Sequence, residues 1–73
     1  MKRLRTGIIG CGHFAHQHAG HLASLEDVQL VGFCDQVIQK AVVFNQQYAD
    51  GRGQVYEDYG RMFEELDLDL VYI

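Results

Sequence analysis

Short apolar runs, separated by polar and turn-forming residues, divide this chain into alternating segments. Four of these runs have the length of strands. The pair Ile8-Ile9 in the first run suits a strand that is covered on both faces, as strands of a parallel sheet are. The pattern therefore predicts strands at residues 4–10, 28–34, 54–56 and 68–73.

Between these strands, apolar residues recur at the three- and four-residue spacing of an amphipathic helix. We predict helices at about residues 13–25 and 36–49, and a short third helix that opens at Asp58 or Tyr59. The expected buried faces are Phe14, Ala15, His18, Ala19, Leu22 and Leu25 in the first helix, Val37, Ala41, Phe44 and Tyr48 in the second, and Met62, Phe63 and Leu66 in the third.

Strands and helices alternate strictly along the chain, and the connections between them are short. This order favours an α/β fold with a parallel sheet and right-handed crossovers. We expect the strand order 3-2-1-4, which is the first half of a doubly wound sheet. A ligand site is then expected where the first two strands end, because ligands of such sheets bind beyond the carboxyl ends of the strands.

The junction of the first strand and the first helix has the form Gly-x-Gly-x-x-Ala, which is typical of a dinucleotide-binding turn. Gly10 allows the tight turn, and Gly12 lets the backbone approach a diphosphate closely. Ala15 is small enough for the helix to pack on the strand. The free amides near His13 and Phe14 are expected to face the phosphates at the helix start.

An acidic residue follows at the end of the second strand. Asp35 lies 25 residues after Gly10, close to the offset of about 20 at which a carboxylate binds the adenosine ribose. The carboxylate would repel a 2′-phosphate, and the next residue, Gln36, is neutral, so NAD is favoured over NADP. Lys40 could soften this preference, although a solvated helix residue is the simpler interpretation. Asp35 could instead serve only as the cap of the second helix.

The length, composition, net charge and cysteine count of the chain limit the class of protein to which it can belong. The chain has 73 residues, 48% of them apolar, and a net charge of −4, which predicts one small globular domain. The negative charge argues against nucleic acid or an anionic membrane as a partner. The basic start, Met1 to Arg5, is followed by no apolar run of signal-peptide length. With only two cysteines, we expect a reducing compartment and a cytoplasmic protein.

Four histidines lie at the start of the first helix. His13 and His16 are about 60° apart around the helix axis, and so are His18 and His21. These directions do not let four ligands converge on one tetrahedral ion, so we predict no metal site. A weak site with two histidine ligands is the less favoured alternative. We expect His18 to be a packed histidine on the apolar face. His13 could donate a hydrogen bond to a phosphate.

The two cysteines fall near the ends of adjacent strands. A position at a helix start can lower the pKa of a thiol, which makes Cys11 a candidate for reactivity. Cys34 is close enough along the predicted sheet for a disulfide to be imaginable. We favour two free, reduced thiols beside the cofactor.

Taken together, these segments resemble the amino-terminal domain of the glucose–fructose oxidoreductase/inositol dehydrogenase family (Gfo/Idh/MocA). The resemblance covers nearly the whole chain. It is carried by Gly-Ile-Ile-Gly-Cys-Gly-His-Phe-Ala at 7–15, His-Ala at 18–19, Leu-Val-Gly-Phe-Cys-Asp at 30–35, Val-Tyr-Glu-Asp-Tyr at 55–59 and Asp-Leu-Val-Tyr-Ile at 69–73.

The resemblance implies a Rossmann-like NAD-binding domain at residues 1–73 of an oxidoreductase that acts on a sugar, a cyclitol or a related CH–OH compound. It also implies a catalytic lysine in a Glu-Lys-Pro motif and a separate substrate domain, neither of which is in these residues. We therefore assign no catalytic residue. The predicted cofactor-binding residues are Gly10, Gly12, His13, Phe14, Asp35 and Gln36.

Two other functions remain open at this point. The chain could be a non-catalytic nucleotide-binding module, or a fragment that needs a partner chain, because its fourth strand would be an exposed edge that invites pairing. A homo-oligomer is one form of such pairing. A methyltransferase that uses S-adenosylmethionine also has a glycine-rich turn and an acidic ribose binder, but the spacing and the resemblance favour it least.

Overall fold

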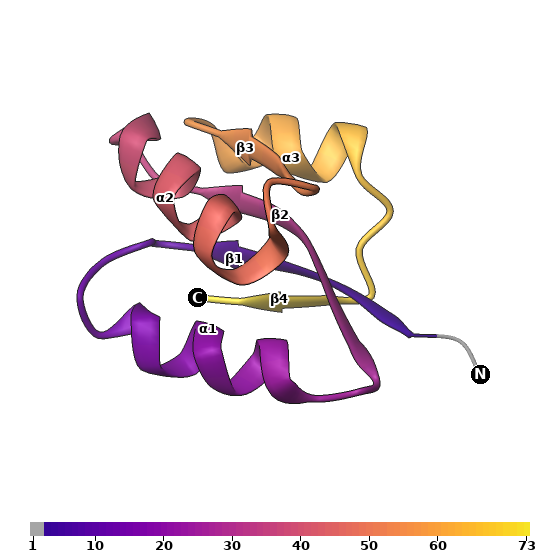
Figure 1. Cartoon of the computed structure of the whole chain (residues 1–73). Coiled ribbons are helices and arrows are strands. Elements are labelled where there is room, and N and C mark those ends of the chain that lie inside the picture. The colour runs from indigo at the N-terminus through magenta and orange to yellow at the C-terminus, as the bar shows by residue number, and fades with distance from the viewer. Residues whose placement is uncertain (1–2) are drawn as a thin grey trace.

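The computed structural model describes residues 3–73, so that Met1 and Lys2 of the basic start lie outside it. Seven elements follow in the predicted order: β1 (Leu4–Ile9), α1 (Ala15–Ser24), β2 (Val28–Cys34), α2 (Ile38–Ala49), β3 (Gln54–Tyr56), α3 (Tyr59–Glu65) and β4 (Leu70–Tyr72). The strands form one parallel sheet in the order β3-β2-β1-β4, which confirms the predicted topology (Figure 1).

Both long helices start later than predicted. α1 begins at Ala15 because the preceding residues form a turn, in which the Ala15 amide donates to the Gly12 carbonyl at 3.1 Å. α2 begins at Ile38 because the Asp35 carboxylate accepts the Val37 amide at 2.8 Å and keeps the two preceding residues in a bend. The bounds of β2 and β3 agree with the prediction.

The helices cover opposite faces of the sheet: α1 and α2 pack on one face, and α3 on the other (Figure 1). Glycines in the two central strands let α3 approach. A Cβ added at Gly32 would lie 2.6 Å from Leu66 Cδ1, and one at Gly7 would lie 3.1 Å from Met62 Cε. Met62 is fully buried there. A seven-residue helix can therefore cover this face with few side chains.

The main core lies between the sheet and the two long helices. Its buried members include Ile8, Ala19, Leu30, Phe33 and Phe44. The pairing of β1 with β2 skips one residue of β2, since Thr6 pairs with Leu30 and the next residue pairs with Gly32. Such a bulge changes which side chains share a face. It allows Leu30 and Phe33, three residues apart, to join the same core.

Several positions that the periodicity assigned to buried faces are exposed. Phe14 is 82% exposed because it precedes the first helical residue and faces away from the core. Val37 is 52% exposed for the same reason, because it lies before α2. Phe63 and Leu25 are also exposed. Of the other expected core positions of α2, Ala41 and Phe44 are buried, and Tyr48 is half-buried against the core.

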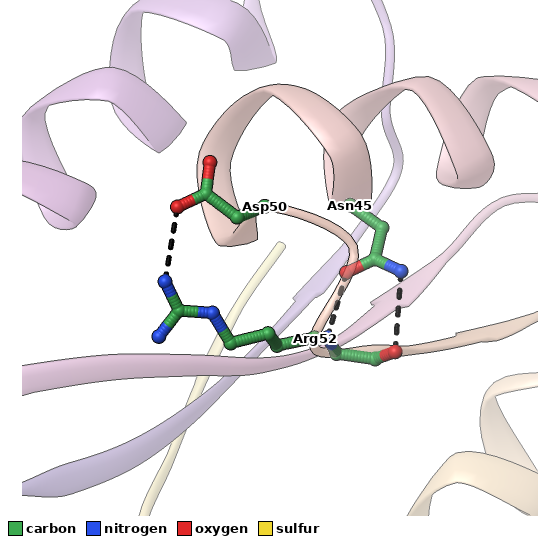
Figure 2. Close-up of polar contacts among 4 residues, drawn as sticks. Asn45, Asp50 and Arg52 are labelled. Atoms are coloured by element: carbon green, nitrogen blue, oxygen red, sulfur yellow. Dashed lines mark hydrogen bonds and ion pairs between the residues drawn. The ribbon is translucent and has the colours of Figure 1, made fainter.

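The connection from α2 to β3 is held by one side chain (Figure 2). The amide of Asn45 donates to the Gly53 carbonyl at 3.1 Å and its oxygen accepts the Gly53 amide at 2.8 Å. Asp50 ends α2 in the left-handed conformation, with φ 52°, and pairs with Arg52 at 3.1 Å. Gly51, the predicted helix stop, follows with φ 75°. The Asn45 contacts therefore fix the point at which β3 starts.

Candidate functional site

The glycine turn, residues 10–14 between β1 and α1, lies at the carboxyl edge of the sheet, where β1 ends between β2 and β4. In Figure 1 this turn and the C-terminus lie at the same edge of the sheet, opposite the N-terminus. The Gly10 amide donates to the Cys34 carbonyl at 2.8 Å, which joins the turn to the end of β2. Gly10 has φ 88°, a conformation that residues with a Cβ rarely adopt, so the turn needs glycine at this position.

The next glycine borders open space. A Cβ added at Gly12 would have no atom of residues 3–73 within 4 Å, so none of these residues fills the space in front of this backbone. The space belongs to a hollow of about 470 Å³, which extends from the glycine turn past His13 and Phe14 to Tyr72 and Ile73 at the end of β4. The hollow is therefore open beside the backbone segment that the sequence predicts for diphosphate binding.

Asp35 lies on the β2 side of the same turn. Its Oδ2 atom accepts the Cys11 amide at 2.8 Å, and its Oδ1 atom accepts the Val37 amide at 2.8 Å. The side chain is half-buried, so part of the carboxylate still faces solvent, and the neighbouring Gln36 is exposed. The prediction that Asp35 caps α2 is only partly right, because the cap position is Val37 and the carboxylate also bonds to the glycine turn.

One of the four histidines does not lie where its spacing predicts. His18 is exposed, with its ring 4.9 Å from that of Tyr72, and it lines the hollow instead of the core. The packed histidine is His16, which lies against Phe44 and whose Nδ1 atom is 2.7 Å from the Tyr48 hydroxyl. His13 is exposed beside the turn. Within residues 3–73, no three His, Cys, Asp or Glu side chains are grouped as metal ligands.

Cys11 and Cys34 are both buried, free thiols, as predicted. The expectation of a lowered pKa at Cys11 is wrong. Burial, and then the negative charge of Asp35, raise the pKa of the Cys11 thiol to about 12. Burial also raises the pKa of Cys34. The Cys11 thiol donates to the Cys34 carbonyl at 3.5 Å, so this side chain helps to anchor the turn.

The amino-acid sequence also matches a known protein family. Residues 4–73 match the family described as "Oxidoreductase family, NAD-binding Rossmann fold". The chain belongs to this Gfo/Idh/MocA family. Its NAD-binding Rossmann fold accounts for the parallel sheet, the strand order and the glycine turn at the carboxyl edge.

Solved structures of similar fold agree with this assignment. The myo-inositol 2-dehydrogenase of Lactobacillus plantarum is 28% identical, with a TM-score of 0.84 over 96% of this chain and 20% of that one. The scyllo-inositol dehydrogenase of Lactobacillus casei, solved with NAD(H) and scyllo-inositol, is 26% identical, with a TM-score of 0.85 over 99% of this chain and 21% of that one.

A third structure, an oxidoreductase of Agrobacterium radiobacter in complex with NAD⁺, L-tartaric acid and magnesium, is 23% identical, with a TM-score of 0.84 over 96% of this chain and 20% of that one; it shows the shared fold. The chain thus spans about a fifth of the length of these proteins. A comparison with curated protein sequences found no match. Among the described residues, no helix is long and apolar enough to cross a membrane.

Sequence reasoning located the glycine turn and Asp35 but missed part of the hollow. Tyr72 and Ile73 line it, although only their strand was predicted, and His18 was assigned to the core. The predicted strand order could have indicated Tyr72 and Ile73. In the order 3-2-1-4, residues at the end of β4 must lie beside the turn at the end of β1.

Proposed function

We propose that this chain is the cofactor-binding domain of an NAD-dependent oxidoreductase, and that residues 10–14, Asp35 and Gln36 hold the cofactor. The observation that carries the proposal is the position of Asp35: its carboxylate is bonded to the backbone of the glycine turn, and Gly12 of that turn faces an open hollow. The residues proposed to bind the diphosphate and the ribose are thus neighbours, which supports NAD as the ligand.

The diphosphate would lie against the backbone at Gly12 and the turn that leads into α1. The amides of His13 and Phe14 belong to this turn and have no carbonyl partner among the described residues. The positive end of the α1 dipole favours an anion at the same place. The exposed imidazole of His13 is close enough to the turn to donate a further hydrogen bond. Gly12 supplies the close approach, since its missing Cβ leaves that space empty.

The adenosine ribose would bind at Asp35. Each carboxylate oxygen uses one lone pair for a backbone amide and has another for a ribose hydroxyl. The exposed Gln36 lies beside it and adds no positive charge. A 2′-phosphate would place negative charge next to this carboxylate, so the arrangement favours NAD over NADP. Lys40 is exposed, and its side chain has no ion pair with any described residue.

The nicotinamide end would extend toward β4. The order β2-β1-β4 puts Asp35 on one side of the glycine turn and the hollow bordered by Phe14, Tyr72 and Ile73 on the other. Bound NAD would supply the hydride acceptor for oxidation of a CH–OH group. This chain would bind and orient the cofactor, and Phe14 offers an apolar surface to its ring. A sugar or cyclitol is the proposed substrate of the whole protein.

Isothermal titration with NAD and NADP tests this assignment in the wild type and in Asp35→Ser. We expect the wild type to bind NAD more tightly than NADP. Asp35→Ser should bind NAD about 10- to 100-fold more weakly than the wild type does, and its preference for NAD over NADP should become smaller or reverse. Asp58→Ser is the matched control, because Asp58 sits at the end of β3 in a similar turn but away from the hollow. Absence of NAD binding, or an equal loss for both cofactors, would contradict the proposal.

A second candidate is a nucleotide-binding module without catalytic activity that assembles with a partner chain. The observation in its favour is the outer edge of β4, which pairs with no other described strand and carries the exposed Leu70. Light scattering separates the two. A folded monomer that binds NAD would argue against assembly, whereas a stable dimer that binds NAD without any dehydrogenase partner would favour the module.

A further inference from the structure

The end of β2 contacts the glycine turn through three hydrogen bonds. The Cys34 carbonyl accepts the Gly10 amide at 2.8 Å and the Cys11 thiol at 3.5 Å, and Asp35 Oδ2 accepts the Cys11 amide at 2.8 Å. Only the last of these bonds has a charged partner, and bonds to an ionised group are roughly twice as strong as neutral ones. Asp35 therefore makes the strongest single link between the turn and the rest of the sheet.

The same carboxylate also fixes the segment that follows β2. Its second oxygen accepts the Val37 amide at 2.8 Å, and the Asp35 amide itself donates to the Tyr56 carbonyl at 3.0 Å. Both oxygens are thus oriented by backbone groups before any ligand arrives. Such a side chain has little freedom left to lose on binding, which is how preorganisation raises affinity.

We propose that Asp35 is a positioning residue for the diphosphate as well as the ribose binder: its carboxylate holds Cys11, and with it Gly12, in the conformation that leaves the hollow open. The ribose part of this statement rests on the proposed function, whereas the tether between Asp35 and the turn does not. The consequence is that ribose and diphosphate binding are coupled. A substitution of Asp35 then weakens the contact with a phosphate that the side chain does not touch.

An asparagine at this position separates shape from charge. Its single amide oxygen can accept only one of the two backbone amides in this geometry, and its NH₂ group would face the other as a second donor. Asp58→Asn is a closely matched control. Asp58 Oδ1 accepts the Gly60 amide at 2.9 Å, two residues on, as Asp35 accepts Val37, but within residues 3–73 no hydrogen bond joins Asp58 to the glycine turn.

Amide hydrogen exchange in the nucleotide-free chain tests the tether. We expect the Cys11 amide to exchange at least about tenfold faster in Asp35→Asn than in the wild type, relative to the amide of the fully buried Phe33, which reports on global opening. Asp58→Asn should leave this ratio unchanged. Equal ratios in all three proteins, or an equal rise in both variants, would overturn the tether.

If Asp35→Asn does not fold, the wild type still decides the question. A scalar coupling across the hydrogen bond, between the Cys11 amide nitrogen and the Asp35 carboxylate carbon, reports the bond without any substitution. Its detection supports the tether. Its absence, together with rapid exchange of the Cys11 amide, would overturn it.

A test of the coupling between ribose and diphosphate binding needs a nucleotide whose ribose lacks the 2′- and 3′-hydroxyls. For 2′,3′-dideoxyadenosine 5′-diphosphate, we expect Asp35→Asn to weaken binding by about tenfold, and Asp58→Asn to leave it unchanged. Unchanged affinity in Asp35→Asn would overturn the positioning role and leave Asp35 as a ribose contact alone. If the wild type binds neither this nucleotide nor NAD, the proposed function fails and the positioning role with it, while the exchange result still decides the tether.

Discussion

Substitution of Gly12 by alanine separates the binding role of the glycine turn from its structural role. The added Cβ would have no atom within 4 Å in the nucleotide-free chain, and Gly12 is not among the residues with positive φ. The folded chain should therefore accept the methyl group without strain. Stability should remain the same or rise by about 0.4–1 kcal/mol, because alanine restricts the unfolded chain more than glycine does.

The open space at Gly12 that lets the chain accept a methyl group is also the space that the nucleotide needs, so Gly12→Ala should weaken nucleotide binding. The methyl group would occupy the space from which a diphosphate approaches the backbone amides of the turn. Loss of one hydrogen bond to a charged phosphate costs about 1.5–3 kcal/mol, which corresponds to an affinity for NAD that is about 10- to 150-fold lower. The prediction is thus a large effect on binding with no loss of stability.

Titration calorimetry with NAD and urea unfolding of the same samples measure both quantities. Gly10→Ala serves as the contrasting variant, since φ at Gly10 is 88° and a Cβ there should cost about 1–3 kcal/mol of stability. If Gly12→Ala bound NAD like the wild type, the diphosphate would not lie against this backbone. If it destabilised the chain as much as Gly10→Ala, the space at Gly12 would not be open.

Three further outcomes follow from particular contacts. Gly53→Ala should lower the free energy of unfolding in urea by about 1–3 kcal/mol, because its Cβ would lie 2.8 Å from Asn45 Oδ1; an unchanged midpoint would show that the α2–β3 connection can shift freely. The pKa of Cys11 is raised from 9.0 to about 12, so the unfolded chain releases this proton first and the free energy of unfolding should fall as pH rises from about 9 toward 12. The free energy of unfolding of Cys11→Ala, measured in urea, should fall less steeply over the same pH range. An identical pH dependence in the two proteins would contradict the raised pKa. Lys40→Ala should leave the affinity for NAD within about twofold, as expected of a solvated charge, and a larger loss in calorimetry would place the ammonium group at the cofactor.

The order of the elements and the outline of the site could be read from the sequence because both depend on short-range patterns. A strand that ends in Gly-x-Gly-x-x-Ala and a second strand that ends in Asp35 place the two ends side by side once the sheet is parallel. The bounds of β2 and β3 follow from apolar runs with clear polar limits. These features need no knowledge of tertiary contacts.

Features that depend on local hydrogen bonds at the helix starts or on tertiary contacts could not be predicted. Periodicity assigned Phe14 and Val37 to helices, but local hydrogen bonds delay both helix starts and leave the two side chains exposed. The bulge in β2 allows Leu30 and Phe33 to share a core, which no alternation within the strand indicates. The Asn45 clamp joins residues across a loop, so its partner is identified only by the folded chain.

The most direct test of the central claim is an NMR titration of the ¹⁵N-labelled chain with NAD. We predict that the amide resonances of Gly12, His13 and Asp35 shift together and saturate with one dissociation constant, while those of Leu4 and Val28, paired at the opposite edge of the sheet, stay in place. Shifts confined to that opposite edge, or none at any NAD concentration up to the millimolar range, would contradict it.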